Sequence, residues 1–562
     1  MRIPADQVDR IQDKNGQTAG KKAFLSGVLL LSVSTVLVKI VGLVYKIPML
    51  SYLGAEGMGY FNSAYEIYAL FCVVATAGLP VALSVLIAAE LEKGDPARAG
   101  RIFRLSLAAF LVIGIAGSAA MAGFSDAFCR AIRSENARLS ILSVAPTVFL
   151  ICVSSALRGY FQGYGNMLPT AVSQLIEALG KLIFGLLLAN AARGAGSDTP
   201  TVAAAAGAGL SLGTLASTLY LIVAAIRKKS SDGIAREQIR PERRSGETRR
   251  IVRSLAGLAV PITLGASAVG LTKLVDMTMI LRRLQTVGFS EAMANEAYGS
   301  YTTLALSVFG LIPTLVNAVA LPLVPMLSAA IAAGDRDRQT DLIRVSFRLT
   351  AWFSIPSALG ITVFSGPILR LLFPAEPEAV AVAAPLLSML GVSVFLSCMI
   401  TATNSVLHAY RSVYLPILAL LAGAAVKIAS AYLLIGIPRV GILGAPVSTL
   451  FCNAVVVLLD LIFVARRCPL GSLWGTFLKP LAFSGASVGI SYGLCLLMRE
   501  RIGEGPAVTL AALGITALLY LLLSILSGGL GEDLTAMPTG NSVARILSRL
   551  RLIPKRKEVQ KE

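Results

Sequence analysis

Long apolar runs separated by short polar segments recur along the whole 562-residue chain. Most runs reach about 20 residues, and as an α-helix rising 1.5 Å per residue each can cross roughly 30 Å of hydrocarbon. The pattern predicts an all-α polytopic membrane protein with about fourteen transmembrane helices. The predicted spans cover residues 23–50, 60–90, 102–123, 139–159, 168–190, 202–226, 254–281, 298–330, 343–364, 384–409, 413–436, 441–465, 476–498 and 507–528.

The composition excludes an ordinary soluble enzyme. Hydrophobic residues make up 55% of the chain and charged residues only 14%, against about 25% charged residues in soluble domains. The first apolar run is too long for the core of a signal peptide, and no small-residue cleavage site closely follows it. We therefore expect it to be retained as the first membrane helix.

The basic residues indicate an orientation. The chain has 50 Lys and Arg against 31 Asp and Glu, a net charge of +19. With the N-terminus inside, 35 of the 50 fall in inner segments, ten in outer segments and five inside spans. This bias predicts a multi-pass protein of the bacterial cytoplasmic membrane with both termini cytoplasmic. The basic loops would meet anionic phospholipids, not nucleic acid.

An internal repeat divides the chain. The segment LIAAELEKGDPARAGRIFRLSLAA from Leu86 resembles LSAAIAAGDRDRQTDLIRVSFRLT from Leu327, and Gly94-Asp95 matches Gly334-Asp335 with an offset of 240 residues. VFLICVSS from Val148 resembles VFLSCMIT from Val394, with an offset of 246 residues. An offset of six spans preserves orientation, which predicts two parallel-repeat six-helix lobes plus two extra C-terminal helices.

The repeat and the loop charges define the predicted domains. They are a cytoplasmic tail (1–22), an N-lobe (23–226), a basic cytoplasmic linker (227–253), a C-lobe (254–465), two further helices (466–530) and a basic cytoplasmic tail (531–562). In this last tail, apolar residues recur every three or four positions beside basic ones, which predicts a short helix lying on the anionic inner leaflet. A solvated tail that only reinforces the topology is the alternative.

Charged residues inside the spans mark the candidate site, because a charge in hydrocarbon costs several kcal/mol unless it faces water, a partner or a ligand. Equivalent helices of the two lobes carry Lys39 and Lys273. We expect a basic cleft between the lobes that binds an anionic group such as a phosphate or pyrophosphate. The candidate substrate-binding residues are Lys39, Lys46, Lys273, Asp276, Glu177, Lys181 and Lys427.

Several of these residues also allow a purely structural interpretation. Lys46 lies near the end of its span and could extend its ammonium group to the interface. Glu177 and Lys181 are four residues apart and could form a local ion pair on one helix face. Glu66 and Lys427 fit either interpretation.

Enzyme and cofactor motifs are absent from the sequence. It has no Walker A, HExxH or CxxC string, a single histidine (His408), and seven scattered cysteines. We therefore expect neither an enzyme nor a protein with a metal or other cofactor.

The segment LRGYFQGYGNMLPTAVSQLIEALGK, from Leu157 to Lys181, resembles the signature of the polysaccharide biosynthesis/stage V sporulation protein B family. That family is related to the MurJ lipid II flippases within the multidrug/oligosaccharidyl-lipid/polysaccharide (MOP) flippase superfamily. VKIVGLVYKIP from Val38 and LPLVPMLSAA from Leu321 look like the same family.

The resemblance implies fourteen helices, two lobes around a cleft, and alternating access. It implies a monomeric flippase that exports an undecaprenyl-pyrophosphate-linked saccharide, such as the peptidoglycan precursor lipid II, in cell-wall synthesis or sporulation. Lys39 stands where MurJ proteins carry arginine, so the charge is kept and the bidentate fork is lost. Lys181 follows the SQxxE string, and Ala178 occupies a position where the family has glutamine.

Three other functions remain open from the sequence. A multidrug and toxin extrusion antiporter would share the fold, but it favours acidic cavity residues. A membrane enzyme that transfers sugar or acyl groups would need acid/base or metal groups. A scaffold for cell-wall or spore-coat assembly would need no cavity charges.

Overall fold

The computed structural model describes residues 5–231, 247–320, 323–412, 414–468, 474–503 and 505–527, and these contain helices but no strand. Thirteen of the helices among them are long and apolar enough to cross a membrane. Many large apolar side chains on these helices are exposed, for example Val112, Leu187 and Leu518, which suits contact with lipid. The prediction of an all-α polytopic membrane protein is confirmed.

The described residues form two compact units. The first comprises residues up to Arg282 together with Glu291–Gly299, and the second comprises Arg283–Ser290 and the residues from Ser300 onward. The predicted lobe boundary at 227–253 stays a prediction, because residues 232–246 lie outside the described part of the chain.

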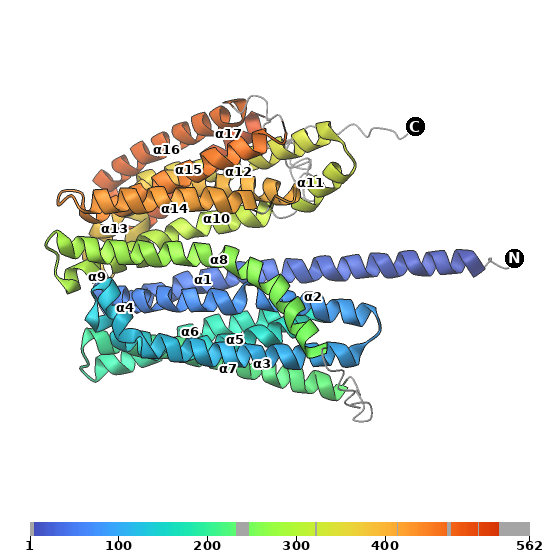
Figure 1. The fold of residues 1–562 in the computed structure, drawn as a ribbon. Helices are drawn as coiled ribbons and strands as arrows, with labels where there is room; N and C mark the ends of the chain where they lie inside the picture. The colour runs from blue at the N-terminus through green and yellow to red at the C-terminus, as the bar shows by residue number, and fades with distance from the viewer. Residues whose placement is uncertain are drawn as a thin grey trace. The chain divides into compact units, whose positions relative to one another are not determined.

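The first unit is a bundle in which α7 packs along both α5 and α6, and α5 packs along α3 (Figure 1). Its helices are α1 (Ala5–Thr76), α2 (Leu79–Glu92), α3 (Pro96–Gly123), α4 (Ser125–Ile132), the 3-10 turn η1 (Glu135–Ala137), α5 (Arg138–Gly163), α6 (Leu168–Gly194), α7 (Thr199–Ser231), α8 (Glu247–Thr286) and most of α9 (Glu291–Ser300).

Helix α1 folds back on itself at Gly54, which has the non-helical angles φ 67° and ψ 175°. The rings of Tyr45 and Phe61 lie 6.3 Å apart, although a straight helix would separate residues sixteen positions apart by about 24 Å. Only glycine adopts this positive φ without strain. The first arm of α1 corresponds to the first predicted span, and the second arm begins the second. The candidate membrane span Val33–Val73, which counts as one of the thirteen, contains parts of both arms.

The second predicted span is interrupted. Residues 60–90 form the second arm of α1 and then α2, with a turn at Ala77 and Gly78. Pro80 lies in the first turn of α2, where its missing N–H costs no hydrogen bond, so it starts a new helix instead of continuing the old one. The expectation of one unbroken helix was wrong there. The predicted span 298–330 falls on α9, a π-helical turn and α10, which follow one another without a break up to Ala320, and on α11 from Leu323.

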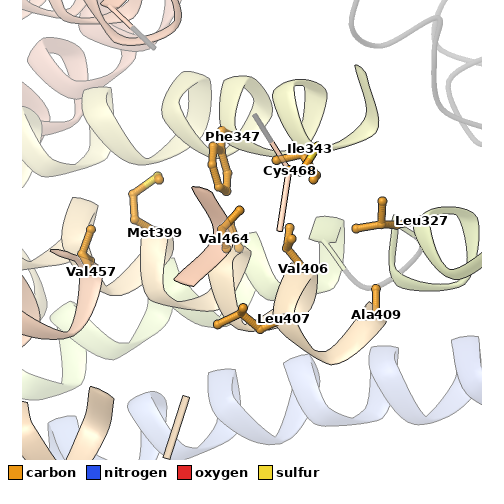
Figure 2. Packing of buried hydrophobic residues seen from close by; sticks show 11 residues of the cluster. Leu327, Ile343, Phe347, Met399, Val406, Leu407, Ala409, Val457, Val464 and Cys468 are labelled. Atoms are coloured by element: carbon orange, nitrogen blue, oxygen red, sulfur yellow. The ribbon is translucent and has the colours of Figure 1, made fainter. Parts of the chain in front are cut away.

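The second unit is also a helical bundle, in which α13 packs against α12 and α15, and α14 against α15. Its helices are the π-helical turn η3 (Tyr301–Ala305), α10 (Leu306–Ala320), α11 (Leu323–Ala332), α12 (Arg336–Leu372), α13 (Pro377–Ala409), α14 (Tyr414–Ile435), the 3-10 turn η4 (Gly441–Leu443), α15 (Gly444–Ala465), α16 (Trp474–Ile502) and α17 (Pro506–Leu526). Figure 2 shows the apolar cluster where α11, α12, α13 and α15 meet.

The predicted repeat recurs as local geometry. Gly94 and Gly334 both adopt a positive φ, 75° and 70°. The next residue in each case, Asp95 or Asp335, caps the following helix by accepting a hydrogen bond from the backbone N–H three residues later, at 2.8 Å and 3.0 Å. Such a cap satisfies a backbone donor that the helix leaves unpaired. The two halves of the chain therefore share the same helix–turn–helix corner, 240 residues apart as the sequence indicated.

The predicted surface helix of the C-terminal tail lies outside the described residues, which end at Ser527.

Candidate functional site

The structure gathers four of the candidate lysines in the first unit. Lys39 and Lys46 lie on the first arm of α1, Lys181 on α6 and Lys273 on α8. The ammonium group of Lys46 repels those of the other three and attracts the Glu66 carboxylate. Lys39 and Lys273 also repel each other directly. We call Lys39, Lys46, Lys181 and Lys273 the basic cluster.

The members of the basic cluster differ in exposure. Lys39 and Lys273 are exposed, whereas Lys46 and Lys181 are partly buried. Each ammonium group offers three donors and no acceptor. The arrangement can therefore bind a group with several anionic oxygens.

Lys181 is held by aromatic rings. Its Nζ atom lies 4.9 Å from the ring centroid of Tyr45, 5.7 Å from that of Phe61 and 4.7 Å from that of Tyr65. A cation above an aromatic face is attracted to the negative side of the ring, by about 0.5–2 kcal/mol for each pair. Tyr45 comes from one arm of α1 and the other two rings from the second arm, so the reversal at Gly54 builds this environment.

Glu177 forms an ion pair with Arg158, and its carboxylate also attracts the Lys181 ammonium group. The guanidinium of Arg158 lies 2.8 Å from the Glu177 carboxylate, and these side chains are only 11% and 21% exposed. Arg158 also donates to the Ser173 hydroxyl at 2.9 Å and the Ser217 hydroxyl at 3.3 Å. An arginine fork that reaches several acceptors is a stronger partner for a carboxylate than a lysine four residues away on the same helix. The group ties α5, α6 and α7 together.

The two remaining candidates are not members of the basic cluster. Asp276 is one turn beyond Lys273 on α8 and is partly buried. Lys427 is partly buried on α14, in the second unit. Whether any of these residues contacts substrate stays a prediction.

Sequence reasoning did not single out two charged groups inside helices. Arg158 lies within α5, and its side chain is only 11% exposed. Asp460, within the apolar string LLDLIF, was not singled out, although it is fully buried on α15. The rule used for the lysines would have found both residues, since a charge inside a span is costly unless it faces water, a partner or a ligand.

Close packing of α6 on α7 sets the position of Lys181. A Cβ atom at Gly213 would come within 2.5 Å of the Lys181 backbone nitrogen and 2.8 Å of the Gly180 carbonyl carbon. We expect Gly213→Ala to lower the free energy of unfolding by about 1–3 kcal/mol, because the two backbones must separate. Thermal unfolding of the purified protein in detergent measures this change.

The matched control is Gly100→Ala in α3, where an added Cβ meets nothing within 4 Å. Alanine in an open helical position should stabilise by about 0.5–1 kcal/mol. Equal effects of the two substitutions would mean that the α6–α7 contact does not limit stability.

The bundle of membrane helices and the basic cluster define a multi-pass membrane transporter. A match to the family described as "Polysaccharide biosynthesis protein" covers residues 24–330, more than half of the chain, and the protein belongs to this family. Residues 300–433 also match the MatE family.

Relatives in Bacillus subtilis (strain 168) agree with the family. The chain is 26% identical to "Stage V sporulation protein B" over 512 residues, 90% of this chain and 95% of that protein. It is 21% identical to "Lipid II flippase MurJ" over 423 residues, 72% and 76% of the two chains.

Solved structures show the same fold. "Lipid II flippase MurJ, inward closed conformation" superposes with a TM-score of 0.65 at 17% identity, covering 89% of this chain and 98% of that one. A multidrug resistance MATE family transporter of the MOP superfamily, in its inward-facing conformation, has a TM-score of 0.61 at 15% identity, covering 78% and 98%. The family and the fold are those of transporters and flippases, not enzymes.

Proposed function

We propose that this protein is a flippase that moves a polyprenyl-pyrophosphate-linked saccharide across the cytoplasmic membrane by alternating access. The observation that carries the proposal is the basic cluster, four lysines within electrostatic reach of one another in a bundle of membrane helices. The similarity in fold to a lipid II flippase supports it.

The electrostatics of the cluster favour an anionic ligand. A single cation inside a membrane already costs several kcal/mol, and like charges that face one another add to that cost. Glu66 attracts Lys46 and Glu177 attracts Lys181, while the lysines also repel one another. A pyrophosphate would add negative charge to this group and accept hydrogen bonds from several lysines at once.

A multidrug antiporter of the same fold is the second candidate, and the similarity to a MATE transporter favours it. The basic cluster argues against it, since four ammonium groups would repel an organic cation.

The experiment uses the full-length protein in vesicles loaded with either a fluorescent lipid-linked saccharide or an organic cation dye. We expect the saccharide headgroup to cross the membrane and the dye to remain. Movement of the dye without movement of the saccharide would assign the antiporter function instead.

Lipid II is the substrate we propose. Expression of this protein should then rescue growth of a strain depleted of its lipid II flippase. If the vesicle assay succeeds and the rescue fails, the substrate is a different lipid-linked glycan.

The proposed orientation, with both termini cytoplasmic, can be tested by labelling. Among the native cysteines only Cys72 is not buried, so we start from a Cys72→Ser variant. A membrane-impermeant maleimide added outside should label a cysteine introduced at Ser197, and should leave unlabelled one at Ser245, which lies outside the described residues. The reverse pattern would invert the topology.

A further inference from the structure

A carboxyl group is fully buried in the second unit. Asp460 lies on α15 with no exposed surface. Its Oδ2 atom is 3.0 Å from the hydroxyl of Thr403 on α13. Its Oδ1 atom is buried and has no hydrogen-bond partner among the described residues. Among the described residues, one hydroxyl is therefore the only polar group that reaches this carboxyl.

Apolar side chains surround the pair. Val457 and Val464 lie about one turn to either side of Asp460 on α15, and Met399 and Val406 flank Thr403 on α13. All four valine and methionine side chains belong to the apolar cluster of the second unit (Figure 2). The carboxyl is thus embedded in a region where an ion is poorly solvated.

No charged group in the described part of the chain compensates Asp460. The titratable side chains on the two helices packed against α15 are Glu378, Cys398 and His408 of α13 and Tyr414, Lys427 and Tyr432 of α14. Burial and the hydrogen bond with Thr403 determine the environment of the Asp460 carboxyl. No charged side chain among the described residues acts on it.

The helix register explains why Lys427 does not reach Asp460. Gly423 of α14 lies against Cys452 and Val456, and Gly444 lies against Ile435, so α14 and α15 run antiparallel. This register places Lys427 level with residue 450 or so, which is about 15 Å along the helix axis from Asp460.

The hydrogen bonds around Thr403 fit a neutral carboxylic acid. A threonine hydroxyl has one proton, and the Thr403 Oγ1 atom also lies 3.0 Å from the carbonyl oxygen of Met399. If Thr403 donates to that carbonyl, as threonines in helices often do, its lone pair can accept a hydrogen bond from a protonated Asp460. The Asp460 O–H then donates to Thr403, and the Thr403 O–H donates to the Met399 carbonyl.

We propose that Asp460 is a proton-binding site, and that it holds a proton at neutral pH in the closed bundle shown here. A metal ion would need several oxygen or nitrogen ligands, and the described residues contain no group of three or more His, Cys, Asp or Glu side chains able to hold one.

The position of the site sets how it exchanges its proton. Asp460 is six residues from Arg466, the residue that follows α15, a rise of about 9 Å. Val464 lies one turn beyond Asp460 toward the C-terminal end of α15, and Val406 lies one turn beyond Thr403 toward the C-terminal end of α13. Both valines belong to the apolar cluster. When α13 and α15 separate enough to admit water, the carboxylic acid can release its proton to that water and become a carboxylate. Closure requires the proton to return.

Infrared spectroscopy of the full-length protein in lipid nanodiscs tests the proposal. At neutral pH we expect a carbonyl stretch from a protonated carboxylic acid that disappears in Asp460→Asn. The matched control is Asp126→Asn, since Asp126 is 59% exposed and paired with Arg138, and this variant should keep the band. Loss of the band in both variants, or in neither, would overturn the proposal.

A second variant keeps the test informative if Asp460→Asn folds poorly. Thr403→Val removes the hydrogen-bond acceptor, so the carbonyl stretch of Asp460 should shift to higher frequency and remain present. An unchanged frequency would refute the assigned hydrogen bond and with it the site. Because no lipid-linked substrate is present, this result does not depend on the proposed flippase function.

Discussion

Replacing Lys39 and Lys273 together with alanine should abolish transport of the lipid-linked saccharide while leaving the protein folded and inserted. The double variant removes two of the four cations of the basic cluster, the two that are exposed. A hydrogen bond to a charged group is worth about 1.5–3 kcal/mol, so losing two lowers transport on the order of a hundredfold or more. The measurement is the initial rate of headgroup translocation in vesicles, normalised to the amount of inserted protein.

Two controls separate charge from shape. Lys39→Arg should retain transport if charge alone matters, since the longer guanidinium keeps the cation. Lys479→Ala removes an exposed lysine from α16 in the second unit and should leave the rate unchanged. Full activity of the Lys39→Ala/Lys273→Ala variant would contradict the assignment of the basic cluster as the headgroup site.

The spans could be predicted because lipid imposes a simple requirement on every membrane helix. A backbone inside hydrocarbon must satisfy its own hydrogen bonds, so helices of about 20 apolar residues are almost obligatory. The repeated Gly-Asp corner was equally readable, since Gly94 and Gly334 need positive φ and the aspartates that follow cap helices. These features depend on local sequence alone.

The partners of the buried charges depend on tertiary structure. Glu177 has Lys181 four residues away on its own helix, but its ion pair is with Arg158, nineteen residues away on α5. The ammonium of Lys181 instead faces three rings from the two arms of α1. Neither arrangement can be read from spacing, because both require knowing which faces of α1, α5 and α6 meet. The gathering of Lys39 and Lys273 was suggested only by the equivalence of their helices in the repeat.

The buried pair of Arg158 and Glu177 carries the largest expected effect on stability. Arg158→Ala leaves the Glu177 carboxylate partly buried without its cation, and removes the donors to Ser173 and Ser217. Breaking one side of a buried ion pair typically costs 3–5 kcal/mol, about the scale expected here. We expect a much lower unfolding temperature of the purified protein in detergent and a reduced yield of inserted protein.

The double variant Arg158→Met/Glu177→Met distinguishes a lost attraction from an uncompensated charge. Replacing both members by apolar side chains of similar size removes the unpaired carboxylate. The free energy of unfolding should then return to that of the unsubstituted protein or exceed it. The exposed pair formed by Arg138 and Asp126, 52% and 59% exposed, provides the comparison, and Arg138→Ala should cost less than about 1 kcal/mol. If Arg158→Ala is as mild as Arg138→Ala, the Arg158–Glu177 pair does not hold α5, α6 and α7 together. The position of Lys181 on α6 must then come from the packing of α6 on α7 around Gly180 and Gly213 and from the rings of α1.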